Sequence, residues 1–192
     1  HSNVELLFLN TDFFVIDSIK KVSVLKQLKK TITRPNCFRL ADARLKHPAH
    51  EGALPLELLQ RVRPEFKQPP MSWAHNFKFR DFGHFEKELL DMAFSWFTSP
   101  ERYHEAARII FAKHVSQNVK YVETSFASGM IEFGGLNGRE VLSAIRSAVP
   151  AGLEVRVFLG IHHNGAGEKM KPVLDEALGW PDLAGIDLHG FE

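Results

Sequence analysis

The chain has 192 residues, of which 44% are hydrophobic, so it can bury a core and a single domain is the default expectation. Its 24 basic and 23 acidic residues give a net charge of +1, which leaves no electrostatic footprint for nucleic acid. No run approaches the roughly 20 apolar residues that a membrane span needs, so we expect no membrane partner either. The single cysteine, Cys37, excludes an internal disulfide framework and favours a reducing compartment, which predicts a cytoplasmic protein.

The first 36 residues are predicted to form an N-terminal arm and helix. Residues 4–16 are apolar and favour a short buried strand or packed arm, and apolar side chains at helical spacing predict a helix over residues 17–32. Residues 37–192 are predicted to form the main domain. Its first strand is the run RLADARL, residues 39–45.

The stretch HPAHEG, residues 47–52, links this first strand to a predicted helix at residues 53–62. Two histidines and a carboxylate therefore lie at the C-terminal mouth of the strand. Neutral imidazole is a common zinc ligand, which makes the stretch a candidate metal site. Taken alone, the same pattern also fits a solvated loop at the start of a helix.

The middle of the chain is predicted to be mostly helical after a Pro-rich loop. A helix is expected to begin near Phe82 to His84, and the clearest helix follows, with Ser99 as its N-cap and Pro100 in its first turn. The aromatic residues here are most simply core, and a hydrophobic lid over an apolar ligand is the alternative. They are Phe77, Phe79, Phe82, Phe85, Phe94 and Phe97.

The C-terminal part alternates between strands and helices with short connections, a pattern typical of parallel βαβ units. We expect strands at 119–127, 153–161 and 183–191, helices at 139–149 and 167–180, and a Gly-rich loop at 128–136. Pro172 would fall in the first turn of its helix. In such sheets, sites assemble at the C-terminal ends of the strands. That edge would bring together HPAHEG, the Ser125–Gly129 turn, His162–His163 and Leu188–Glu192.

Four stretches resemble the adenosine deaminase family of zinc amidohydrolases. HPAHEGALPLELL resembles the family's first-strand motif, a His-x-His pair followed by an apolar residue, an acid and a glycine. NFKFRDFGHFEKEL resembles the stretch ahead of the family's lid helices, and YHEAARIIFAKHVSQNVKYVETSF is similar to its long helix and next strand. LAGIDLHGFE resembles the strand end G-x-D-L-x-G-x-E. The four stretches occur in family order and span residues 47–192.

The resemblance implies an α/β fold of the (β/α)8 TIM-barrel type, with about the first four strand–helix units in this chain. It also implies a hydrolase in which a zinc-activated water converts adenosine, or a related 6-aminopurine, to inosine. His47 falls on the first zinc ligand. Glu51 and Gly52 fall on the acid–glycine pair, whose acid contacts the ribose, and Gly190 falls on the glycine whose backbone approaches the purine.

The spacing of the two histidines departs from the family pattern. The family's second ligand comes two residues after its first, whereas here that position is Ala49 and the histidine is His50. Residues three apart in a strand face opposite ways, so His47 and His50 can both ligate zinc only if Pro48 bends the chain.

The chain is also shorter than the roughly 250 residues of a full barrel and ends after what would be its fourth strand. The family's remaining zinc ligands and its proton-transferring residues lie beyond that point, so no catalytic residue is assigned. A half-barrel would expose strand edges, which invites a second chain or a missing C-terminal half to complete it. We therefore expect an adenosine deaminase-like hydrolase acting on a purine nucleoside, with a non-catalytic half-barrel for association or purine binding as the alternative.

Overall fold

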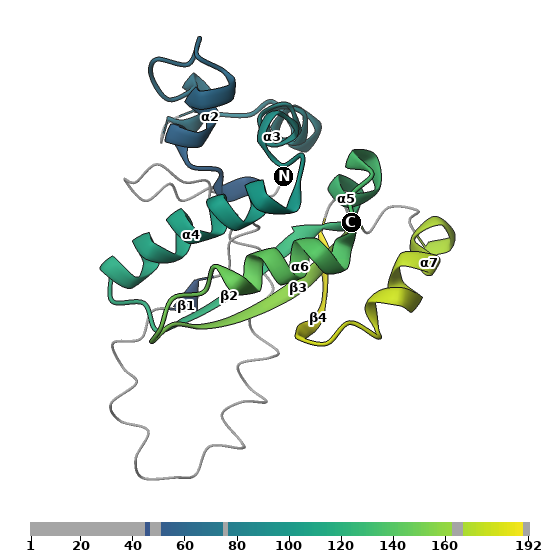
Figure 1. The fold of residues 1–192 in the computed structure, drawn as a ribbon. Helices are drawn as coiled ribbons and strands as arrows, with labels where there is room; N and C mark the ends of the chain where they lie inside the picture. The colour runs from purple at the N-terminus through teal and green to yellow at the C-terminus, as the bar shows by residue number, and fades with distance from the viewer. Residues whose placement is uncertain (1–44, 47–50, 75–76, 163–166, 190–192) are drawn as a thin grey trace, which may run out of the picture.

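The computed structural model of the protein describes residues 45–46, 51–74, 77–162 and 167–189. Its centre is a parallel sheet of four strands that are neighbours in chain order (Figure 1). The strands are β1 (Leu45–Lys46), β2 (Tyr121–Ala127), β3 (Glu154–His162) and β4 (Leu183–His189). This sequential order is the one found in β/α barrels, whereas doubly wound sheets reverse direction at a switch point.

Helices occupy most of the chain between the strands. After β1 come η2 (Glu51–Ala53), α2 (Leu56–Val62), η3 (Met71–Trp73), α3 (Phe82–Trp96) and α4 (Pro100–Ser116). After β2 come α5 (Ser128–Gly134) and α6 (Gly138–Ser147), and α7 (Gly167–Ala177) precedes β4. The predicted arm and helix of residues 1–36 lie outside the described residues, so that division of the chain stays a prediction.

The main core lies between the sheet and the helices α4 and α6, which pack against each other (Figure 1). On β2, Val122 and Phe126 are buried, and on β3 the buried residues are Val155, Val157 and Leu159. Both sets follow the two-residue period of a strand with one face on a core. These apolar side chains explain why the two segments form strands, as predicted.

The opposite face of β2 and β3 is polar in its N-terminal half, and Phe158 lies further along it. Tyr121 pairs in register with Glu154, and Glu123 pairs with Arg156. The Tyr121 hydroxyl donates to Glu123 at 2.8 Å, and the guanidinium of Arg156 donates to Glu154 at 3.0 Å. The side chains of Glu154 and Arg156 are more than half exposed. In a closed barrel this face would be filled by side chains from the other strands.

The strand β4 carries exposed apolar side chains on its helix-facing side. Ile186 pairs with Leu159 and Leu188 pairs with Ile161, and both β3 residues are buried on the helix side. Ile186 and Leu188 nevertheless remain 36% and 67% exposed. Among the described residues, this end of the sheet therefore lacks the cover that α4 and α6 give to its centre.

Two local expectations from the sequence are wrong. Residues 128–134 form the helix α5 instead of a Gly-rich loop, because Met130 and Ile131 are buried and anchor it against the sheet. Pro172 lies inside α7, five residues after its start at Gly167, and not in its first turn. The helix continues past the proline to the buried Ala177, so packing there offsets the backbone hydrogen bond that a proline cannot donate.

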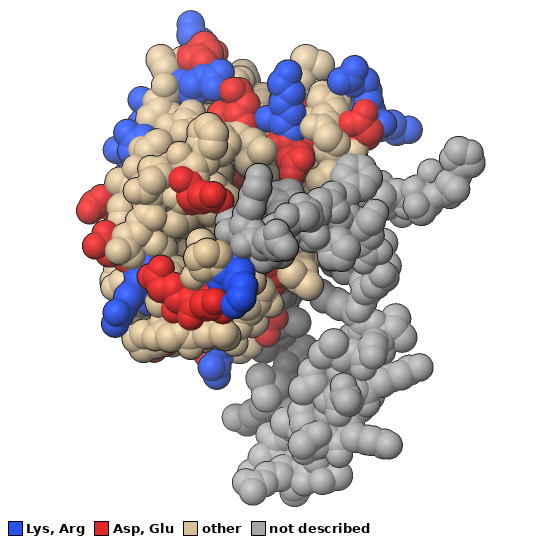
Figure 2. Space-filling view, turned by 90° about the vertical axis from the view of Figure 1, so that its right-hand side faces the viewer, with Lys and Arg blue, Asp and Glu red and all other residues tan. Residues whose placement is uncertain are grey.

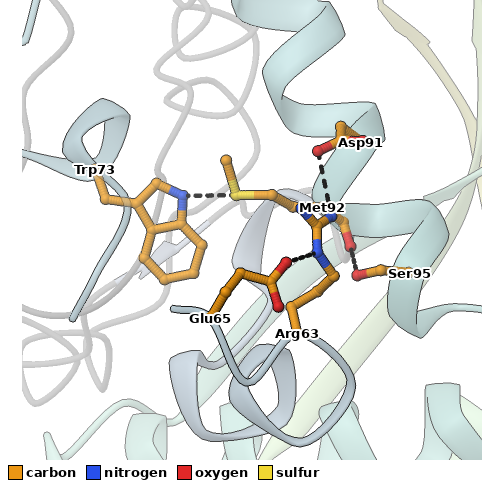
Figure 3. Close-up of polar contacts among 6 residues, drawn as sticks. All are labelled: Arg63, Glu65, Trp73, Asp91, Met92 and Ser95. Atoms are coloured by element: carbon orange, nitrogen blue, oxygen red, sulfur yellow. Dashed lines mark hydrogen bonds and ion pairs between the residues drawn. The ribbon is translucent and has the colours of Figure 1, made fainter. Parts of the chain in front are cut away.

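The helices α2 and α3 form a layer toward the end of the sheet where α5 lies (Figure 1). Figure 3 shows how this layer is tied together. Arg63, just after α2, binds Glu65 and, at 3.3 Å, Asp91 of α3, while the Trp73 indole N–H donates to the sulfur of Met92 at 3.2 Å. The start of α3 is capped as well, because Asp81 accepts a hydrogen bond from the backbone N–H of residue 84.

None of the helices in the described part of the chain combines the length and apolar character that a membrane crossing requires. On the face shown in Figure 2, Lys and Arg side chains stand among Asp and Glu side chains, with no single large basic patch. This distribution matches the near-balance of charge in the sequence.

Candidate functional site

The C-terminal ends of the strands meet at one edge of the sheet. The last residue of β2, Ala127, pairs with Gly160 of β3, which in turn pairs with Asp187 of β4. Because Leu159 faces the helices, Gly160 and Asp187 lie on the opposite face, as in the lumen of a barrel. This edge is where parallel β/α proteins assemble their sites.

Glu51 reaches this edge from η2 and is buried there, with 5% of its surface exposed. Its Oε1 atom accepts two hydrogen bonds of 2.9 Å, one from the hydroxyl of Tyr103 on α4 and one from the backbone N–H of Ala127. The carboxylate thus joins η2 to α4 and to the end of β2. The Oε1 atom of this buried carboxylate therefore has two donors inside the protein.

Burial sets the electrostatics of this contact. Desolvation raises the pKa of Glu51 above its ordinary value, although the hydrogen bonds from Ala127 and Tyr103 act in the opposite direction. Burial also raises the pKa of Tyr103, and the neighbouring Glu51 charge adds to that effect. The Tyr103 hydroxyl therefore keeps its proton and acts as a hydrogen-bond donor to Glu51.

The predicted site residues fall partly within the described chain. Glu51 and Gly52 lie together in η2 and are buried, so the acid–glycine pair is at the expected edge of the sheet. His47, His50 and Gly190 lie outside the described residues. Among the residues that are described, no group of three His, Cys, Asp or Glu side chains is placed to hold a metal ion. The metal and purine contacts of these residues stay predictions.

Tyr103 is the site residue that sequence reasoning missed. Tyr103 lies on the buried face of α4, and helical spacing in the sequence says nothing of its hydroxyl. A buried tyrosine hydroxyl usually finds a partner, and that was the available signal. The partner is 52 residues away in the sequence, so only the tertiary structure identifies it as Glu51.

Aromatic side chains of α3 and α5 lie near the same edge. Phe94 of α3 and Phe133 of α5 are in contact, with ring centroids 4.8 Å apart, and Phe133 is 80% exposed. Phe85 and Phe97 are buried, which confirms the expectation that they belong to the core. Phe77 and Phe79 are half-buried and in contact with each other, and Phe82, also half-buried, packs on Phe85.

Neither a family model nor a curated protein matches the sequence. Solved structures do match the fold. The chain is 17% identical to an adenine deaminase from Arthrobacter aurescens, with a TM-score of 0.63, over 78% of this chain and 49% of that one. It is 19% identical to the N6-methyl-AMP deaminase of Arabidopsis thaliana, with a TM-score of 0.56, over 78% of this chain and 49% of that one. It is 16% identical to an amidohydrolase from Burkholderia ambifaria with bound zinc, with a TM-score of 0.56, over 85% of this chain and 49% of that one.

These likenesses define the class of fold. At such low identity they concern the backbone arrangement, and the chain spans about half the length of each of these proteins. The described residues therefore form an α/β unit with a parallel sheet whose backbone is similar to about half of each of these solved structures.

Proposed function

We propose that this chain is one half of a zinc-dependent deaminase acting on a 6-aminopurine, the half that carries the first metal ligands. The observation that carries the proposal is the position of Glu51. The acid of the HPAHEG stretch lies at the C-terminal edge of a sequential parallel sheet, where the first-strand motif of such a hydrolase is expected. The likeness of the fold to three hydrolytic enzymes supports it.

In this proposal, His47 and His50 would hold the zinc, because they lie between the end of β1 and Glu51. Imidazole nitrogen is a suitable zinc donor, and bound zinc supplies a water that is nucleophilic near neutral pH. A catalytic zinc has three protein ligands, so at least one more would come from a second chain or from a C-terminal half. Gly52 and Gly190 would line the approach of the purine.

Three purine classes are candidates for the substrate, with adenosine first. A carboxylate at residue 51 suits a ribose hydroxyl and disfavours a 5′-phosphate. However, Oε1 of Glu51 is already occupied by Tyr103 and Ala127, which leaves less of the carboxylate for ribose and brings the free base adenine into consideration. A nucleotide is the third class, because one of the similar structures is a deaminase of N6-methyl-AMP.

The alternative function is non-catalytic association or purine binding by the half-barrel. The exposed side chains of Ile186 and Leu188 on β4 favour it, because such a face is covered in a closed barrel. The two functions differ in a measurable way. Turnover of adenosine, adenine and AMP that a zinc chelator stops supports the deaminase, whereas no turnover with a preparation that binds metal supports the alternative.

The assignment of the metal ligand is tested by His47→Ala. We expect this variant to lose zinc binding, measured as bound zinc after dialysis, because the first ligand is removed. His104→Ala is the control, since its ring is occupied by the Ala144 carbonyl and Ser147 hydroxyl between α4 and α6. Full retention of zinc in His47→Ala would rule out His47 as a ligand.

A further inference from the structure

The strand β4 contains a β-bulge on its way to the C-terminal edge of the sheet. Leu183 pairs with Val157, but the next residue of β3, Phe158, pairs with Gly185. Ala184 is therefore an extra residue in β4. A bulge of one residue moves every following side chain of its strand to the other face of the sheet.

The bulge decides on which face the Asp187 carboxylate lies. Counted without the extra residue, Asp187 would pair with Ile161, which is buried on the helix side of the sheet. With the extra residue, it pairs with Gly160 and faces the side that would be the lumen of a barrel. The bulge thus turns a carboxylate away from the apolar core and toward the face on which β/α barrels build their sites.

The geometry of Gly185 shows that the bulge is a built feature of the strand. Its φ angle is +157°, a conformation that side chains rarely adopt, and a Cβ atom there would lie 3.3 Å from the Phe158 ring. The burial of apolar side chains does not account for the bulge, because Ile186 and Leu188, which it turns toward the helix side, remain 36% and 67% exposed. Bulges are common next to active sites, where they re-aim a side chain.

The layer of lumen-facing residues nearest the edge is small apart from Asp187. Ala127 of β2 contributes a methyl group to this layer and Gly160 contributes no side chain. A glycine inside a strand often marks a place where a ligand approaches the backbone closely. Asp187 is half-buried, and in the described part of the chain no hydrogen bond or ion pair engages its carboxylate. It can therefore accept a hydrogen bond from a ligand at this edge.

We propose that Asp187 is a substrate-binding residue, aimed by the bulge at Ala184, that accepts a hydrogen bond from an N–H group of the 6-aminopurine. The amino group of such a purine is a donor, and a charged acceptor holds a donor more strongly than a neutral one does. For the identity of the ligand, this inference rests on the proposed function. It adds an acceptor whose oxygens are not already used, unlike Oε1 of Glu51.

The binding of adenine, the ring that the three candidate substrates share, tests this role by calorimetric titration of the full chain with zinc. We expect Asp187→Asn to raise the dissociation constant about tenfold or more, because the charged acceptor is lost. Asp182→Asn is the matched control: Asp182 is exposed just before the other end of β4, and its φ angle of +72° suits asparagine. It is expected to bind adenine as the wild type does. Equal affinity in Asp187→Asn and the wild type overturns the proposal.

A second pair of variants tests the aiming of the carboxylate by the bulge. Gly185→Ala places a side chain at a strained φ angle and against Phe158, so we expect it to displace Asp187 and to weaken adenine binding about as much as Asp187→Asn does. Gly152→Ala is the control, because Gly152 has a φ angle of +82° but no atom within 4 Å of an added Cβ. It is expected to lose stability and to keep the wild-type affinity for adenine. Wild-type affinity in Gly185→Ala would contradict the aiming by the bulge.

Bound zinc, measured on the same preparations, separates the role of Asp187 from the proposed function. Zinc retained in Asp187→Asn, together with weaker adenine binding, supports the proposal. Loss of zinc in this variant would make Asp187 a metal ligand and overturn it. If the wild type holds zinc but binds no adenine, the role of Asp187 falls. If the wild type holds no zinc, the deaminase proposal falls, and adenine binding alone decides the role of Asp187.

Discussion

A buried carboxylate such as Glu51 makes the stability of the protein depend on pH. Burial raises the pKa of Glu51 above its usual value of 4.5, so the folded chain holds this proton more tightly than the unfolded chain does. The free energy of unfolding therefore falls as the pH rises above 4.5, and continues to fall until the folded carboxyl is ionised as well. The stability that Glu51 contributes is fully present only when the pH is below the pKa that this carboxyl has in the unfolded chain.

Glu51→Gln is expected to remove this dependence. The amide cannot titrate but can still accept the hydrogen bonds from Tyr103 and Ala127. The variant should be close to the wild type near pH 4 and more stable than it by about 1 kcal/mol or more at pH 8. Urea unfolding at several pH values measures the difference, and Glu57→Gln on the exposed side of α2 is the control. A constant difference across this range would contradict the effect of burial.

The role of Glu51 could be predicted only in part from the sequence. Its place at the end of the first strand followed from the HPAHEG stretch and the alternation of strands and helices. Its burial and its partners did not, because a carboxylate beside a glycine at a helix start is equally compatible with solvent. The hydrogen bonds from Tyr103 and Ala127 are long-range, and local patterns carry no information about them.

At the scale of elements, the packing of α6 depends on the absence of a side chain. A Cβ atom at Gly138, the first residue of α6, would come within 2.3 Å of the Trp180 indole. Trp180 follows α7 and is buried, and its N–H donates to Glu176. Gly138 therefore allows the segment after α7 to pack closely against the start of α6.

Gly138→Ala is expected to destabilise the protein by about 1–3 kcal/mol, because the indole has to move out of a packed position. Urea unfolding followed by tryptophan fluorescence measures the change. Gly129→Ala in α5 is the matched control, because its Cβ would have no atom within 4 Å. Alanine is also the better helix former, so this variant is expected to be neutral or slightly more stable. A Gly138→Ala protein as stable as the control would contradict the proposed contact.

The helices that sequence patterns located well are those with clear caps and long periodic faces. The start of α3 at Phe82 and the N-cap of α4 at Ser99 agree with prediction. The helix α5 was missed because two of its seven residues are glycines, Gly129 before the apolar pair Met130–Ile131 and Gly134 at the end of the helix. In such a short segment, burial against the sheet decides the conformation and local propensity does not.

At the scale of the whole molecule, the alternation of strands and helices with short connections predicted a parallel sheet. The sequential strand order was implied by the family resemblance and not by the alternation, because doubly wound sheets alternate in the same way. The alternation does not reveal how many strands the complete sheet has, because each strand–helix pair repeats the same pattern. The solved structures that share the fold are about twice as long as the matched region. Whether further strands close the sheet therefore depends on a part of the fold that the matched region does not include.

The exposed side chains of Ile186 and Leu188 on β4, which no described helix covers, predict association with whatever completes the sheet. Leu188→Glu places a charge on a surface that must become dry on association, so we expect the association constant to fall about tenfold or more. Sedimentation velocity over a range of concentrations, alone and with a candidate second half, measures it. Met71→Glu on η3 is the control, because Met71 is exposed to a similar degree but lies in another layer. Equal weakening by both variants would contradict a specific role for β4.

The polar face of β2 and β3 limits which second half can close such a barrel. It presents two carboxylates, Glu123 and Glu154, against one guanidinium, Arg156. A half with a purely apolar inner wall would strip water from these ions without replacing it, which is costly. A half with such an apolar inner wall would therefore not close a barrel with this chain, even where its backbone matches. A chimera should fold only when its inner layer brings cationic or hydrogen-bonding groups, so that charge and not shape selects among otherwise equivalent halves.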